Sequence, residues 1–92
     1  MKLNLSKIPE YMHEGIQEYV DHGRPTGSFL RAIFCNNLVD AAATADINNK
    51  TCLFAYASLL YNEIPRAAWG DEKSVDRWIK VGGMDHYMKV GE

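Results

Sequence analysis

The pattern of apolar and polar positions along the chain predicts helices, and it is clearest at residues 51–61. This stretch has no charged residue, and its apolar side chains lie at every angle around a helix. One face has apolar residues at the i, i+3, i+4 and i+7 spacing, namely Leu53, Tyr56, Ala57 and Leu60. Phe54 and Leu59 are apolar residues at other angles around the same helix. A helix that is apolar on all sides has to be covered by neighbours. We therefore expect a buried central helix here, around which the other segments pack.

An amphipathic helix is predicted before this stretch, between Pro9 and Gly23. Proline suits the first turn of a helix and glycine suits its end. The apolar stripe of this helix has five members: Tyr11, Met12, Ile16, Tyr19 and Val20. Gly15 would allow a neighbouring helix to approach closely.

The longest predicted helix follows the turn at residues 24–28, with Thr26 as its N-cap, and continues to about Asp46. Leucine, isoleucine, phenylalanine and alanine side chains repeat along it at the helical period. Asn37 falls on this apolar face, so we expect its amide to make a structural hydrogen bond near the core. Asn48 or Asn49 can then cap the central helix.

A short helix is predicted between Asp71, as N-cap, and the glycine pair at residues 82–83. Val75, Trp78 and Ile79 would face inward from it. Residues 2–6 fit an edge strand or an extended arm equally well, and residues 84–90 fit a strand or a last helical turn. The whole chain, residues 1–92, is thus predicted to be one mostly α domain, a small bundle of about four helices with short terminal segments that are extended or helical.

Composition places the chain among ordinary globular proteins, with 47% hydrophobic and 24% charged residues. The formal net charge of −2 predicts no bulk affinity for nucleic acid, so any such contact would need local clusters of lysine and arginine. Cys35 and Cys52 fit buried free thiols in a reducing compartment better than a disulfide. The N-terminus has no apolar run of a secretion signal, and we expect a cytosolic protein.

Charge is segregated between the first and the last predicted helix. Acidic side chains recur at i+4 steps on the first helix, where they form either a solvated face or a surface for a basic partner: Glu10, Glu14, Glu18, then Asp21. On the outer side of the last helix, Lys73, Arg77 and Lys80 form a basic stripe. This stripe is either a solvated face balanced by Glu72 and Asp76 or a contact surface for phosphates or acidic groups.

A binding protein therefore explains the sequence better than an enzyme. The chain contains no glycine-rich phosphate loop, no His-Glu-x-x-His and no Cys-x-x-Cys, and its histidines lack metal-ligand spacing. We expect no catalytic residue, no cofactor and no metal site. Six outward basic residues are the candidates for partner binding: Arg24, Arg31, Arg66, Lys73, Arg77 and Lys80.

Motifs spread over nearly the whole chain resemble a family of small phage- and prophage-encoded proteins, the type I-F anti-CRISPR proteins. They are Ile8-Pro9-Glu10-Tyr11-Met12, Gly15-Ile16, Gly27-Ser28-Phe29-Leu30, Asn37-Leu38, Ala45-Asp46, Asn49, Leu60-Tyr61-Asn62-Glu63-Ile64-Pro65, Ala68-Trp69-Gly70, Val75, Trp78 and Gly82-Gly83. These motifs consist mostly of core and turn residues, so the resemblance assigns no contact residue.

The resemblance implies an inhibitor of the Csy surveillance complex, made in the cytoplasm of the infected bacterium. It would bind the protein subunits, and the guide RNA where exposed, so that target DNA cannot hybridise or be held. No membrane and no small-molecule substrate is implied. The alternative is a small phage regulator or adaptor that binds DNA or a host protein through a helix face, although no helix-turn-helix stands out.

Overall fold

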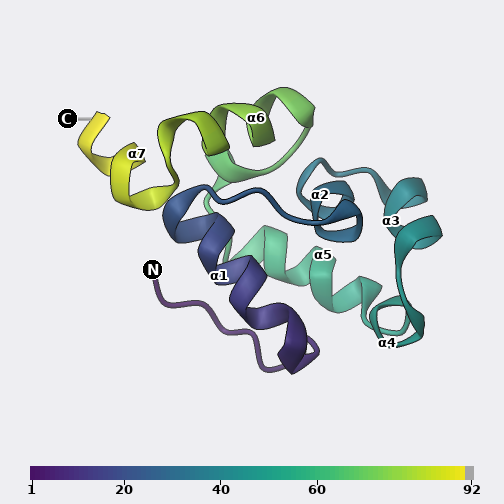
Figure 1. Cartoon of the computed structure of the whole chain (residues 1–92). Helices are drawn as coiled ribbons and strands as arrows, with labels where there is room; N and C mark the ends of the chain where they lie inside the picture. Colours follow the sequence, from purple (N-terminus) through teal and green to yellow (C-terminus); the bar gives the residue numbers. More distant parts are fainter. Residues whose placement is uncertain (91–92) are drawn as a thin grey trace.

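Helices form all the regular secondary structure in the part of the chain that the computed structural model describes, residues 1–90, with side chains through residue 87 (Figure 1). Two 3-10 helices and seven α-helices follow one another in the order η1 (Glu10–Met12), α1 (His13–His22), α2 (Ser28–Phe34), α3 (Leu38–Thr44), α4 (Ile47–Lys50), α5 (Leu53–Asn62), η2 (Arg66–Ala68), α6 (Glu72–Val81) and α7 (Met84–Val90). The helical class is as predicted, but these residues form more helices than the expected four.

Residues 28–46 form separate helices instead of the single long helix that the pattern predicted. Asn36 adopts a left-handed conformation with φ of 61°, and the side chain of Asn37 accepts a hydrogen bond of 3.0 Å from the backbone nitrogen of Asp40. Asn37 is thus the exposed N-cap of α3, not a residue near the core. Asparagine tolerates the left-handed region and competes for backbone donors, which explains the break. The predicted N-cap Thr26 is also wrong, because Gly27 holds that position without a side-chain cap.

The segment before α5 is a further helical turn, α4, and its polar residues differ from the predicted caps. Asp46 caps α4 by accepting a 2.8 Å hydrogen bond from the backbone nitrogen of Asn49. Asn49 is itself buried, and its side-chain oxygen accepts a 2.7 Å hydrogen bond from the hydroxyl of Tyr56. The residue before α5 is Cys52, and it makes no side-chain cap.

Tyr19 lies at the centre of the core and joins four elements. Its ring stacks on Phe34 with the ring centroids 4.2 Å apart, and its hydroxyl donates a 2.6 Å hydrogen bond to the carbonyl of Ala68. The indole nitrogen of Trp78 donates to the carbonyl of Tyr19 at 2.9 Å. All four residues are fully or almost fully buried. The hydroxyl of Tyr19 and the indole N–H of Trp78 thus have hydrogen-bond partners although they are buried. These contacts hold α1, α2, η2 and α6 in fixed positions relative to one another.

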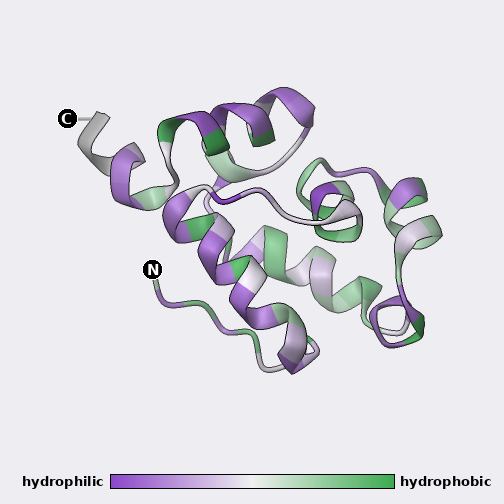
Figure 2. Ribbon diagram, viewed as in Figure 1, coloured by the Kyte–Doolittle hydropathy of each residue, from purple (hydrophilic) through white to green (hydrophobic). Residues whose placement is uncertain are grey.

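Helix α5 buries one face and exposes another, so the prediction that it is covered on all sides is wrong. Tyr56, Leu59 and Leu60 are buried, whereas Phe54 is 87% exposed and Tyr61 is 84% exposed. Figure 2 shows hydrophobic and near-neutral residues alternating along the ribbon of α5. A chain of this length does not supply enough elements to cover both sides of every apolar helix.

The terminal segments settle two alternatives that the sequence left open. Residues 2–6 are an extended arm, since no strand occurs among residues 1–90, and the tail forms α7. This last helix packs against α1, and η2 packs against α6. As Figure 1 shows, α6 and α7 lie along one edge of the molecule while α3 and α4 lie at the opposite end from α7. The molecule measures 41 × 25 × 19 Å along its principal axes.

Candidate binding surface on helix α6

Helix α6 is fixed at both ends and along one side. Asp71 caps its start by accepting a 2.7 Å hydrogen bond from the backbone nitrogen of Ser74, and Gly82 ends it in the left-handed conformation, with φ of 89°. These are the boundaries that the sequence predicted. Val75 and Trp78 face the core with about 1% exposure, and Ile79 is half-buried. The opposite side of the helix therefore has a defined direction.

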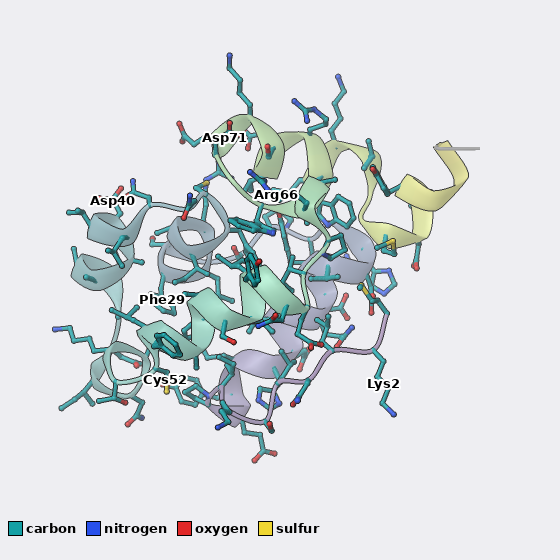
Figure 3. The ribbon with its side chains drawn as sticks, turned by 180° about the vertical axis from the view of Figure 1, so that it is seen from behind. Lys2, Phe29, Asp40, Cys52, Arg66 and Asp71 are labelled. Atoms are coloured by element: carbon teal, nitrogen blue, oxygen red, sulfur yellow. The ribbon has the colours of Figure 1, made fainter. Side chains whose placement is uncertain are left out.

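The basic stripe Lys73, Arg77 and Lys80 lies on that outer side, and all three residues are exposed. Their spacing places them on adjacent turns, so three positive charges point into solvent together. Figure 3 shows long nitrogen-tipped side chains extending from α6 away from the rest of the molecule. Among the side chains that the structure describes, none forms an ion pair with these three.

The acidic residues Glu72 and Asp76 of α6 pair with a cation that lies outside the basic stripe. Arg31 of α2 donates a 2.9 Å hydrogen bond to Asp76 and lies 3.8 Å from the carboxylate of Glu72. The hydrogen bond to Asp76 is the main reason that the pKa of Arg31 is raised. Because Glu72 and Asp76 are engaged by Arg31, they do not neutralise the basic stripe by direct pairing. Asp71 at the start of the helix is close enough to Lys73 and Arg77 that their charges help to lower its pKa, so the stripe still has one acidic neighbour.

The other candidate cations are engaged within the chain. Arg24 donates a 2.9 Å hydrogen bond to Glu18. Arg66 lies over the ring of Trp69, 4.4 Å from its centroid, and donates to the carbonyl of the same residue. Both arginines are exposed, and such contacts cost little to exchange for others. The structure therefore separates the six candidates into three that hold internal partners and the three of the basic stripe.

An open groove of about 640 Å³ runs beside the stripe between α2, α3 and the start of α6. Arg31 and Lys73 both line it, so two of the six candidates meet there. Cys35 also lines the groove. It is a free thiol that is half-buried, not fully buried as predicted, and burial raises its pKa. The groove carries charges of both signs, so it is suited to contact the polar surface of another macromolecule.

The acidic face of the first predicted helix is only partly available. Asp21 forms an ion pair of 2.7 Å with the N-terminal amino group and accepts a 2.8 Å hydrogen bond from the side-chain amide of Gln17. Glu18 forms an ion pair with Arg24. Glu10 and Glu14 remain exposed. Contacts within the chain thus take up half of the predicted acidic surface.

Three helices carry large apolar side chains on their outer surface, which the sequence analysis missed. They lie on α3, α4 and α5: Leu38, Val39, Ile47, Phe54 and Tyr61, each at least 71% exposed. The lack of any charge at residues 51–61 was a signal for this surface as well as for the core.

Other chemistry is sparse in residues 1–90. No group of three or more His, Cys, Asp or Glu side chains that could hold a metal ion occurs among the described residues. Nor is any described helix both long and apolar enough to cross a membrane. Comparisons with protein-family models, with curated proteins and with solved structures gave no match.

Proposed function

We propose that the protein is a non-catalytic inhibitor of the type I-F (Csy) CRISPR surveillance complex, acting in the cytoplasm of the infected bacterium. It binds the assembled, guide-loaded complex in proportion to its amount and keeps target DNA from hybridising or being held. The sequence resemblance to type I-F anti-CRISPR proteins supports the target. The observation that carries the binding mode is the basic stripe on α6, whose cations point outward while Arg31 holds the acids of the same helix.

A guide-loaded complex offers RNA phosphates together with acidic protein groups. A stripe of three cations on a capped helix can contact phosphates without rearrangement of the core, so binding orders these side chains but does not have to order the backbone. Each phosphate contact releases counterions, which makes the association sensitive to salt. Arg24, Arg31 and Arg66 lie on other elements and can add contacts by exchanging their internal partners.

The test is a titration of the protein into a fixed amount of purified Csy complex, followed by measurement of target DNA binding. We expect inhibition to be complete near equimolar protein and to be accompanied by co-elution of the protein with the complex. A CRISPR complex of another type serves as the specificity control. Complete inhibition at a small fraction of one equivalent, persisting after the protein is removed, would contradict a binding mechanism and indicate a modifying enzyme. Full DNA binding at tenfold excess of protein would show that the target is wrong.

A further inference from the structure

The outer face of α5 carries a short, uncharged, exposed stripe. Phe54, Ala57, Ser58 and Tyr61 repeat at the i, i+3, i+4 and i+7 spacing and are all exposed. The two aromatic side chains at its ends are 87% and 84% exposed. Soluble monomers scatter single apolar residues over their surfaces, but two large aromatic side chains on one face of an uncharged helix mark a contact surface. We infer that this face binds a second copy of the same chain, with the two α5 helices antiparallel.

The order of residue types along the stripe fits this partner. Read in either direction, the stripe runs aromatic, small, small, aromatic, and its midpoint lies between Ala57 and Ser58. In an antiparallel pair with a two-fold axis at that midpoint, Phe54 of one copy lies beside Tyr61 of the other at both ends. The small residues meet in the middle, where the two backbones come closest. A two-fold interface needs such self-complementarity, because each copy presents the same surface to the other.

Charge and area agree with the same arrangement. A two-fold axis brings like groups together, and α5 has no lysine, arginine, aspartate or glutamate to repel its copy. A small apolar hollow of about 70 Å³ is lined by Ala57 of α5 and by Leu38 of α3, which is 71% exposed. Leu38 therefore extends the apolar face of α5 onto α3. Two aromatic side chains and a leucine expose on the order of 500 Å² per copy, or about 1,000 Å² in a dimer. This is the lower limit for a specific interface, so the dimer dissociates on dilution.

Sedimentation velocity over about 5 to 500 µM tests the dimer. The wild-type chain of 10.4 kDa should shift reversibly toward twice this mass as the concentration rises. Phe54→Glu should weaken association at least tenfold, because a carboxylate then faces the Tyr61 ring of the second copy. Lys2→Gln is the matched control, since it changes the net charge by the same amount at an exposed position on the N-terminal arm. Both variants should melt close to wild type.

A charge pair distinguishes the antiparallel arrangement from every other. Mixing Phe54→Glu with Tyr61→Lys should restore a heterodimer, because one end gains a Glu–Lys pair and the other end keeps the native aromatic pair. A parallel dimer would place position 54 against position 54 and would not be restored. A wild-type chain that stays monomeric at 500 µM, or folded variants that fail to associate when mixed, would overturn the inference. In the first case the face would be left for a different protein.

Discussion

The backbones of Gly23 and Gly83 pack directly against each other at the point where α1 and α6 end. A Cβ atom on Gly23 would lie 2.7 Å from the backbone nitrogen of Gly83, and one on Gly83 would collide with the backbone of residues 21–23. Both glycines also have a left-handed backbone, with φ of 68° and 77°. Each position therefore requires glycine for its conformation and for the space. This contact fixes where the chain leaves α6 and turns toward α7.

The first prediction concerns this contact. Gly83→Ala should lower the free energy of unfolding by roughly 2–4 kcal/mol, because it combines a strained φ with overpacking against backbone that cannot move aside. Thermal melts should show a fall of about 10 °C or more in Tm. Gly15→Ala is the control of opposite sign. In the first turn of α1, its Cβ would make an ordinary 3.5 Å contact with Leu30, and the better helix propensity should stabilise the protein by up to about 0.5 kcal/mol. Equal melts for both variants would show that the two helix ends do not meet.

Local signals predicted the ends of α6 and tertiary contacts determined the rest. Asp71 and Gly82 act through hydrogen bonds and dihedral angles within a few residues of themselves, so the sequence suffices to place them. The need for glycine at position 83 depends on α1, which no local pattern reveals. Asn36 and Asn37 interrupted an unbroken apolar period, because side-chain competition for backbone donors outweighed the periodicity.

A second prediction separates the two sides of α5. Leu60 is only 6% exposed, and Leu60→Asp places a carboxylate in the core without a partner, which should unfold the domain. Phe54→Asp makes the same kind of change on the same helix at a position that is 87% exposed. That variant should stay within about 1 kcal/mol of wild type. Far-ultraviolet circular dichroism during thermal melts measures both. A Leu60→Asp variant that melts within a few degrees of wild type would contradict the burial of this face.

The third prediction concerns the N-cap of α6 and its dependence on pH. Hydrogen bonds from the backbone and side chain of Ser74 hold the pKa of Asp71 below its ordinary value of 3.8. The folded state thus favours the ionised form. The stability that the ionised Asp71 carboxylate contributes to the fold is fully present above the ordinary pKa. It is lost as the pH falls through the lower pKa of the folded state.

Asp71→Asn isolates this contribution, because asparagine is as good an N-cap as aspartate but does not titrate. At pH 7 it should melt close to wild type, whereas Asp71→Ala should melt at a lower temperature. Between about pH 4 and pH 2 the wild type should lose more Tm than Asp71→Asn does. Parallel curves for the two proteins over this range would show that the carboxylate does not act as the cap.

The sequence placed the basic stripe correctly on the outside of α6 but could not say which of the six cations hold partners. Arg31 meets Asp76 only because the fold brings the side chain of Arg31 on α2 within reach of α6, and Arg24 meets Glu18 only because the chain turns at Gly23 after α1. Both pairs join residues whose proximity is set by the fold. The apolar face of α5 was missed for a related reason, since the pattern of a helix does not state how many neighbours the chain can supply.

The last prediction tests the basic stripe. Replacing Lys73, Arg77 and Lys80 together by alanine should weaken binding to the Csy complex. It should also flatten the dependence of log affinity on log salt by about one unit for each phosphate that the stripe no longer reaches. Exposed charges without internal ion pairs contribute little to folding, so the triple variant should melt almost as wild type does. The measurement is affinity at several salt concentrations, with a melt of each protein.

A second triple variant controls for net charge. Lys2, Lys7 and Lys50 are exposed and lie outside α6, so replacing them by alanine removes the same three charges from elsewhere on the molecule. A general electrostatic attraction would weaken binding equally for both variants. If α6 binds phosphates directly, only the first variant binds more weakly, and it alone changes the salt slope by the full amount. Unchanged affinity and slope in the folded stripe variant would show that the stripe is a solvated face. Glu10 and Glu14 would then be the next surface to mutate, as a mimic of nucleic-acid charge toward basic subunits.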